Sequence, residues 1–409
     1  METSLVDLNI VKSKSAVCTI VSKNYLAYAK VLAESVKKWN PDLDFYLLIV
    51  DRKDEKITIA GINVIWVEDL DIKEFEKISF KYNILELNTN VKPTLLLTLL
   101  QRYEKAIYLD PDILVCSPLN EIYSELQNAA IVLTPHVLTL KPADAPDNEI
   151  SLLNSGVFNL GFVGVSNASQ GIEFLQWWEQ RCLYSAYDEL ENGLFVDQKW
   201  VNLVHCGFDS VKVLRHHGMN VAYWNYHERA LSIKNGMVHV NDNHPLVFFH
   251  FSGLTGNNEV LSKYKPDLRI KETDVVYGML VEYKAALAAK EHTTLSKLSY
   301  GFGNFSNGEA INSFTRRIYA SVNENFSSNP FDANGDFYHF SKNNKLISNS
   351  KSAQGAIDSK NYKEKKQFKF LIALFKTAFF ILGVNRYDML MKFLRKTTTV
   401  RKQTWLFDK

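Results

Sequence analysis

Short apolar runs alternate with helical patterns from residue 16 to about residue 260, and this alternation constrains the fold more than any other feature. Tyr25–Trp39 and Val91–Tyr103 have the apolar spacing of amphipathic helices. The strand-like runs are Ala16–Val21, Phe45–Val50, Ile62–Val67, Ala106–Leu109, Ala129–Thr134 and Val157–Val165. This alternation predicts an α/β fold, in which a mostly parallel sheet carries helices on both faces. Ligands of such sheets bind at the carboxyl ends of the strands.

The pattern changes after Lys265. We expect an α/β domain over residues 1–265 and a helical extension over 266–300, where Val275–Lys290 has the pattern of one amphipathic helix. Residues 301–362 are rich in Asn, Ser and Gly, so we expect a loosely ordered region there. Basic amphipathic helices are expected over 363–409.

Basic residues concentrate at the C-terminal end. From Asn361 to Lys409 there are 12 Lys or Arg against 3 Asp or Glu, whereas residues 1–360 carry 35 against 42. Phe370–Gly383 is an apolar run of 14 residues interrupted by Lys376, shorter than the roughly 20 residues that span a bilayer. Apolar residues interleaved with Lys and Arg are typical of helices that lie in a membrane interface. We expect the tail to bind an anionic membrane surface and no nucleic acid, although a packed C-terminal helix could have the same composition.

Two features indicate a reducing compartment. The four cysteines, Cys18, Cys116, Cys182 and Cys206, are scattered and include no CxxC pair, which favours buried thiols over disulfides or zinc ligands. The first residues, METSLVDLNIVKSKS, lack the cationic start and apolar stretch of a secretory signal. The expected location is cytoplasmic, at the inner face of the membrane.

Asp110 and Asp112 lie one residue apart and form a DxD motif, an aspartate pair separated by one residue. The motif follows directly after a strand-like run, in YLDPDILV, Tyr108–Val115. Asp110 and Asp112 are therefore candidates to hold a divalent cation, Mn²⁺ or Mg²⁺, through oxygen ligands. Such a cation could bridge the phosphates of a nucleotide diphosphate sugar and neutralise the leaving group. Asp-Pro is also common in turns, so the motif by itself fits an ordinary acidic turn as well.

Five other elements resemble glycosyltransferase family eight, the glycogenin and lipooligosaccharide galactosyltransferase family, and occur in the family's order. They are Ser22-Lys23-Asn24-Tyr25 after the first strand, Lys92 ahead of the DxD strand, Asn154-Ser155-Gly156 in LLNSGVFNLGFV, Asp197-Gln198 in LFVDQKWVNLV, and His250 in VFFHFSG. The resemblance covers roughly residues 16–265. It implies the GT-A fold, a nucleotide-binding α/β domain.

The resemblance also implies a role for each matching residue. Asp110, Asp112 and His250 are expected to hold the metal. Asn154, Asp197 and Gln198 are expected to line the transferred sugar as the catalytic residues, with Gln198 on the face where positive charge develops. The residues expected to contact the nucleotide-sugar donor are Thr19, Val21, Ser22, Asn24, Tyr25, Lys92, Asp110, Ser155, Gly156, Ser252 and Gly253.

Each of these residues also has a simpler interpretation. His250 follows the apolar run PLVFF and could be a core histidine, and Lys92 could be an ordinary lysine at a helix start. Asn154-Ser155-Gly156 could form a turn, and Asp197 could be a helix N-cap.

The segment after His250 departs from the family. Family members follow this histidine with a Gly and then Lys-Pro-Trp, and that lysine contacts the diphosphate. Here Leu-Thr-Gly-Asn-Asn follows Gly253, and the next lysines are Lys263 and Lys265. The diphosphate contacts after His250 are therefore left open.

By resemblance, the chain is a metal-dependent hexosyltransferase of polysaccharide biosynthesis. It would move a sugar from a nucleotide diphosphate donor, UDP-linked, to a glycan or lipid-linked acceptor with retention. One alternative is a phosphohydrolase of the haloacid dehalogenase type. In that family the DxD motif follows the first strand, whereas in this chain four strand-like runs precede Asp110, which argues against this alternative. The other alternative is a non-catalytic sugar-nucleotide-binding protein, against which the intact Asp110, Asp112 and His250 argue.

Overall fold

The computed structural model of the 409-residue chain describes residues 15–142, 144–145, 149–347 and 366–407. The chain folds into two compact units. The first consists of residues 1–73 and 84–301, and the second of residues 74–83 and 302–409. The short segment 74–83 therefore belongs to the unit that is otherwise formed by the C-terminal part of the chain.

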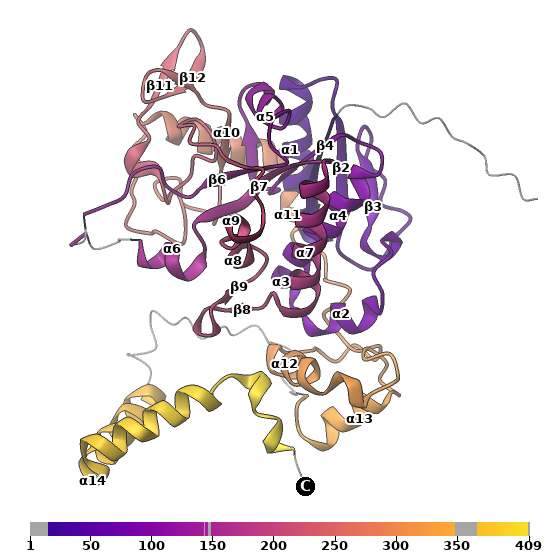
Figure 1. The fold of residues 1–409 in the computed structure, drawn as a ribbon, viewed down its shortest axis with the longest axis vertical. Helices are drawn as coiled ribbons and strands as arrows, with labels where there is room; N and C mark the ends of the chain where they lie inside the picture. The colour runs from indigo at the N-terminus through magenta and orange to yellow at the C-terminus, as the bar shows by residue number, and fades with distance from the viewer. Residues whose placement is uncertain (1–14, 143, 146–148, 348–365, 408–409) are drawn as a thin grey trace, which may run out of the picture. The chain divides into compact units, whose positions relative to one another are not determined.

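A seven-stranded sheet in the order β10-β6-β7-β4-β1-β2-β3 forms the centre of the first unit (Figure 1). Strand β7 runs antiparallel to its neighbours β4 and β6, and the other neighbouring pairs are parallel. The predicted mostly parallel sheet is therefore confirmed. The strands are β1 Ser15–Val21, β2 Asp44–Ile49, β3 Asn63–Trp66, β4 Lys105–Leu109, β6 Ile131–Pro135, β7 Phe158–Ser166 and β10 Val211–Val213.

Helices cover both faces of this sheet, which is why strand β1 is buried along its whole length (Figure 1). On one face, Leu32 of α1 (Leu26–Trp39) and Ile122 of α5 (Asn120–Glu125) pack with Ile107 of the sheet. On the other face, α4 (Lys92–Leu100) packs against α7 (Ser169–Ser185). Leu96 of α4 and Phe174 of α7 are fully buried there.

Short elements extend from this framework. Strand β5 pairs antiparallel with β14, and further small sheets are β8-β9 and β11-β12-β13. Their bounds are β5 Ile113–Val115, β8 Asp188–Glu189, β9 Leu194–Phe195, β11 Leu231–Lys234, β12 Met237–Val240, β13 His244–Pro245 and β14 Phe248–His250. The remaining helices of this unit are α3 Ile84–Asn90, α6 Ile150–Ser155, α8 Gln198–Val201, α9 Val204–Gly207, α10 Val275–Ala289 and α11 His292–Leu295.

The first unit continues to residue 301, beyond the boundary at 265 expected from the sequence. Helix α10 is the physical reason. Its Val276, Leu280 and Tyr283 belong to the same buried cluster as Phe251, and the rings of Tyr283 and Phe251 stack with centroids 4.2 Å apart. The expected helical extension is thus part of the α/β core.

The second unit differs from the loosely ordered region expected over 301–362. Helix α2 (Phe75–Lys81) packs with α12 (Ser313–Val322), and α13 (Asp336–Asn343) follows; residues 348–362 lie outside the described residues. Between the Asn, Ser and Gly residues lie aromatic side chains, and these form a core around Phe80. The ring centroids of Tyr319, Phe331 and Phe337 are 4.7, 4.9 and 5.3 Å from that of Phe80.

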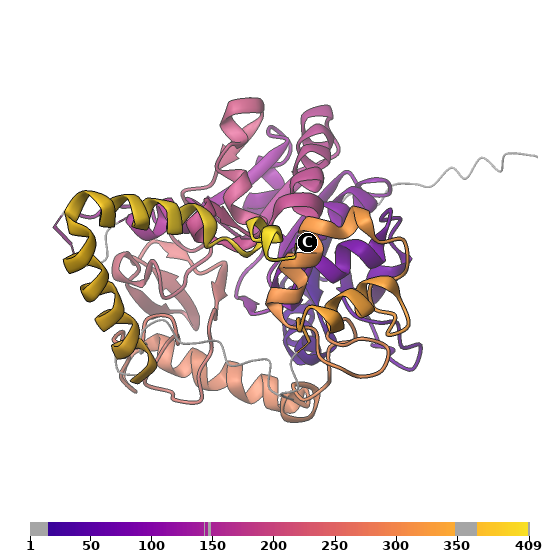
Figure 2. The same cartoon turned by 90° about the horizontal axis from the view of Figure 1, so that it is seen from below.

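The predicted C-terminal helix pair is present as α14, Lys366–Thr397, which is interrupted at Gly383 (φ 71°, ψ 168°). Figure 2 shows the sharp bend between its two limbs. Among the described residues, Lys369–Thr397 is the one helix long and apolar enough to cross a membrane by length and composition, and none of its most apolar window is buried. The sequence-based expectation of a stretch too short to span counted only the apolar run; the helix is longer than that run, but Gly383 divides it into two shorter limbs.

Candidate functional site

The DxD motif forms the turn between β4 and β5, at the carboxyl end of a central strand. The backbone N–H of Asp110 donates to the Gly161 carbonyl of β7 at 2.7 Å, and the Ile113 N–H donates to the Asp110 carbonyl at 3.1 Å. These bonds fix the direction in which the two carboxylates leave the sheet. The hydroxyl of Tyr108, near the end of β4, donates a hydrogen bond to Asp110 Oδ1 at 2.7 Å and so orients the Asp110 carboxylate.

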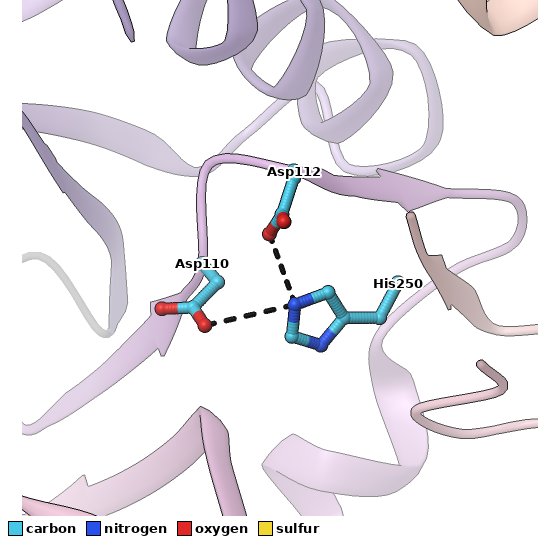
Figure 3. Close-up of side chains that lie close together, drawn as sticks. All are labelled: Asp110, Asp112 and His250. Atoms are coloured by element: carbon cyan, nitrogen blue, oxygen red, sulfur yellow. Dashed lines mark ion pairs between the residues drawn. The ribbon is translucent and has the colours of Figure 1, made fainter. Parts of the chain in front are cut away.

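His250 reaches this turn through the register of a small sheet. Strand β14 pairs with β5 so that His250 lies opposite Ile113, and the Phe251 N–H donates to the Asp112 carbonyl at 2.9 Å. The imidazole Nε2 is 2.9 Å from Asp112 Oδ1 and 3.7 Å from Asp110 Oδ2 (Figure 3). One ligand atom from each of the three side chains lies within 4.8 Å of the others. Residues far apart in sequence thus meet in the arrangement expected of a metal site.

The chemistry of this donor set fits a divalent cation. Burial lowers the pKa of His250, but the neighbouring carboxylates of Asp112 and Asp110 outweigh burial and leave that pKa raised. The imidazole therefore sits where positive charge is favoured. A cation would supply that charge in place of the proton, with one imidazole and two carboxylate ligands, and carboxylate oxygens are the ligands that suit Mn²⁺ and Mg²⁺.

Lys92 and Asp197 form a buried ion pair beside the carboxylates. Lys92 Nζ lies 2.6 Å from Asp197 Oδ2, donates to the Leu160 carbonyl at 2.8 Å, and lies 4.3 Å from the ring centroid of Tyr108. Burial raises the pKa of Asp197, and Lys92 counteracts that shift. Asp197 is therefore tied to Lys92 and is not a solvated helix cap.

Gln198 is held at both ends of its amide. Its Oε1 accepts from the Leu160 N–H at 3.1 Å and its Nε2 donates to the Ser155 carbonyl at 3.0 Å. Gly156 makes room for this side chain, because a Cβ at Gly156 would lie 3.1 Å from Gln198 Cγ, and its φ of 127° suits glycine. The amide is therefore fixed by backbone groups before any ligand enters.

A cavity of about 1080 Å³ opens over these residues. It is large enough for a nucleotide and a sugar, since small-molecule sites commonly measure about 300–1,000 Å³. The predicted residues that line it are Val21, Ser22, Asn24, Tyr25, Lys92, Asp110, Asp112, Asn154, Ser155, Asp197, Gln198, His250, Ser252 and Gly253. Thr19 and Gly156 do not line it: Thr19 is fully buried in β1, and Gly156 lies beneath Gln198.

The same cavity has a second wall that sequence reasoning missed. Tyr223, Trp224 and Tyr264 line it, with the ring centroids of Tyr223 and Tyr264 6.0 Å apart. The aromatic run AYWNY was the signal available in the sequence. Lys263 and Lys265, whose role the sequence left open, line the cavity as well, because the segment after Gly253 folds back and the Lys263 N–H donates to the Gly253 carbonyl at 2.9 Å.

Comparison with known proteins identifies the class. Residues 16–170 match the family model described as Glycosyl transferase family 8; the match includes the DxD turn and Asn154–Gly156 but ends before Asp197 and His250. The protein is a glycosyltransferase with a GT-A type fold. Residues 16–170 resemble glycosyltransferase family 8, and this match supports assigning the chain to that family. The phosphohydrolase and non-catalytic alternatives are thereby set aside.

The individual relatives and solved structures below are between 14% and 26% identical to this chain in sequence. Uncharacterized protein YfnF of Bacillus subtilis (strain 168) is 26% identical over 246 residues, which cover 58% of this chain and 81% of that protein. Among solved structures, the galactosyltransferase LgtC in complex with donor and acceptor sugar analogs is 16% identical, over 67% of this chain and 95% of that chain, with a TM-score of 0.41. The glycosyltransferase GlyE of Streptococcus pneumoniae is 14% identical, over 75% and 73%, with a TM-score of 0.39.

Proposed function

We propose that this glycosyltransferase is metal-dependent and transfers a hexose from a nucleotide diphosphate donor, UDP-linked, to a glycan or lipid-linked acceptor. The observation that supports this is the meeting of Asp110, Asp112 and His250 at the wall of the large cavity. A Mn²⁺ or Mg²⁺ ion held by these three side chains would supply positive charge to the diphosphate leaving group.

Two lysines add to that charge. Lys263 and Lys265 line the cavity, and we assign to them the diphosphate contacts that family members make through a Lys-Pro-Trp segment. A diphosphate leaves with the electron pair of its bond to the anomeric carbon, so fixed cations around it stabilise the transition state. The anomeric carbon then bonds to an acceptor hydroxyl, whose proton is released.

The sugar would lie against the residues on the other side of the carboxylates. Asn154 and Gln198 line the cavity there, and Asp197 is held in place by Lys92. Because the Gln198 amide is already bonded to backbone at both ends, it is pre-organised rather than recruited by the donor. We propose that Gln198 faces the anomeric carbon; retention of configuration is proposed from the resemblance to the family.

The test uses the full-length protein and a panel of UDP-sugars, with Mn²⁺ in one arm and EDTA in the other. Release of UDP is the readout, and inorganic phosphate is measured in parallel. We expect UDP release from one donor with Mn²⁺ and none with EDTA. Equal turnover in EDTA would contradict metal dependence, and no UDP release from any donor of the panel with Mn²⁺ would contradict the UDP assignment.

We also propose that α14 attaches the enzyme to the cytoplasmic face of an anionic membrane, close to a lipid-linked or surface acceptor. Large apolar side chains of α14 are exposed to solvent, with Phe380 92% exposed. The others with at least half of their surface exposed are Phe370, Leu374, Ile381, Val384, Met389 and Phe393. The surplus of nine basic over acidic residues from Asn361 to Lys409 (12 minus 3) matches anionic headgroups in charge.

The interruption at Gly383 favours a helix that lies in the interface over one that spans the bilayer. Residues 366–382 make a limb of about 25 Å and residues 384–397 one of about 21 Å, at 1.5 Å per residue. Both limbs are shorter than the roughly 30 Å hydrocarbon core. A spanning helix would have to straighten at Gly383.

Vesicle binding distinguishes the two modes. The full-length protein should sediment with vesicles of phosphatidylglycerol and phosphatidylcholine but not of phosphatidylcholine alone, and it should be released as salt rises. A spanning helix would resist both high salt and alkaline extraction. Failure to bind the anionic vesicles at low salt would contradict the membrane proposal while leaving the catalytic one intact.

A further inference from the structure

His250 can bind a metal through Nε2 only if its other ring nitrogen carries the proton. A neutral imidazole has one N–H donor and one acceptor nitrogen, and the partner of the non-ligating nitrogen decides which is which. In this protein Nε2 faces Asp110 and Asp112, while Nδ1 lies 3.2 Å from Oδ1 of Asn220. The question is whether the Asn220 oxygen or its amide nitrogen faces the ring.

A backbone donor fixes the answer. The Gly161 N–H, which can only donate, lies 3.1 Å from the Asn159 side chain, so that atom is the Asn159 carbonyl oxygen. The same oxygen is 3.0 Å from the Asn220 side chain, which must therefore present its NH₂ group; this NH₂ also lies 3.0 Å from the Thr134 hydroxyl. The remaining Asn220 atom, its oxygen, faces His250. Since two acceptors would repel, Nδ1 carries a proton; when a cation takes the place of a proton between Nε2 and the carboxylates, the Nε2 lone pair is then the one free to bind it.

The backbone holds Asn220 in this place. The His250 N–H donates to the Val221 carbonyl at 2.8 Å, which puts Asn220 beside the ring, and Asn225 Nδ2 donates to the Asn220 carbonyl at 3.0 Å. Asn220 adopts φ of 53°, in the left-handed region that asparagine tolerates better than most residues. It is fully buried and does not line the cavity.

The ring itself has little freedom to turn away. A Cβ on Gly161 would lie 2.5 Å from His250 Cε1, so the imidazole packs directly against the backbone of β7. On another side the ring of Trp224 meets it edge-on, with centroids 5.1 Å apart and an interplanar angle of 87°. With the ring fixed in this way and a cation on the Nε2 side, the hydrogen bond at Nδ1 keeps the remaining proton away from Nε2.

We infer that Asn220 is a positioning residue of the metal site: it holds the proton on Nδ1 of His250 and so keeps Nε2 available as a ligand. This inference rests on the proposed metal site and adds to it a residue that touches neither metal nor substrate. Loss of such a partner of a metal-binding histidine typically weakens metal affinity by about 10–100-fold.

The test measures Mn²⁺ binding to the full-length protein without any nucleotide sugar, from the electron paramagnetic resonance signal of free Mn²⁺. Asn220→Gly keeps the left-handed backbone but removes the amide, and we expect about 10–100-fold weaker binding. Asn40→Ala is the matched control: Asn40 is also a buried amide, accepting from the Leu119 N–H at 3.0 Å, but it follows the far end of α1.

Each outcome of these experiments either supports or overturns the role inferred for Asn220. Wild-type affinity in Asn220→Gly, or an equal loss in Asn40→Ala, would overturn the inference. If a variant fails to fold, nitrogen NMR of labelled histidines in the wild-type protein with Mg²⁺ gives the same decision: a protonated Nδ1 on His250 supports the inference and an unprotonated one contradicts it. Absence of Mn²⁺ and Mg²⁺ binding by the wild type would instead refute the proposed metal site, and the inference with it.

Discussion

The sheet edge around His250 and the helix α14 depart from ordinary protein chemistry in opposite directions. At the sheet edge, ionisable side chains are buried: His250 is 4% exposed, and Lys92 is 1% exposed. In α14, large apolar side chains face solvent instead. Burying charge and exposing apolar surface are both unfavourable unless a partner compensates. The comparison teaches that the sheet edge pairs its buried charges within the fold, as Lys92 does with Asp197, whereas the compensation that we propose for α14 is a lipid surface outside the chain.

The largest effect is expected from Asp112→Asn. The amide keeps the size of the side chain but removes a charge that the proposed cation needs, so we expect the transfer rate to fall by about 10²–10³-fold or more with the fold intact. Turnover of a UDP-sugar and the thermal unfolding midpoint are the measurements. Asp242→Asn is the control, because Asp242 is an exposed carboxylate of a surface ion pair. A wild-type rate for Asp112→Asn would mean that the DxD motif is only a turn.

Lys92→Met tests the buried charges at the sheet edge through the free energy of unfolding. Removing Lys92 leaves the Asp197 carboxylate buried without its partner, which should destabilise the fold by about 3–5 kcal/mol. The matched variant Lys92→Met with Asp197→Leu removes both charges and should recover most of that loss. Denaturant unfolding of both variants measures the difference. Equal instability of the single and double variants would show that packing, and not the charge pair, dominates at this site.

Gln198→Ala addresses the sugar side of the cavity. We expect the rate to fall by about 10–100-fold because the anomeric carbon loses a pre-positioned group. Binding of UDP, measured by calorimetry, should change little. A large loss of UDP affinity would move Gln198 to the nucleotide side of the site.

The smallest effect is expected in α14. Phe380→Ser removes one exposed aromatic side chain, and losing its partial burial in the interface should weaken vesicle binding by about 1 kcal/mol, with no change in turnover of soluble donor. Leu140→Ser is the control, since Leu140 is 78% exposed but belongs to the first unit. Equal vesicle binding by wild type and Phe380→Ser would indicate that α14 does not insert this side chain.

Much of the site could be predicted because it follows from local patterns. The DxD motif comes directly after an apolar run, and a parallel sheet brings such strand ends to one edge. His250 was expected at the same place on family resemblance, and the register of β14 against β5 is what puts it there. The DxD motif is carried by residues close together in sequence, whereas the place of His250 was expected only from the resemblance, because the pairing that puts it there joins distant strands.

What could not be predicted depends on contacts between distant residues. Asn220, Asn159 and Thr134 form one hydrogen-bonded group although 86 residues separate Thr134 from Asn220, and no local pattern marks them. Residues 302–347 of the second unit were expected to be loosely ordered because their Asn and Ser residues mask the aromatic side chains that pack around Phe80. Composition gives the number of aromatic residues, but it does not show that Phe80 of α2 lies at the centre of their cluster.

The most direct test of the central claim is anomalous scattering from crystals of the full-length protein grown with Mn²⁺ and UDP. The account predicts a manganese peak bonded to the carboxylates of Asp110 and Asp112 and to Nε2 of His250, at ligand distances of about 2.0–2.6 Å. A manganese peak elsewhere, or none in crystals that contain UDP in the cavity, would contradict the assignment of these three residues as the metal site.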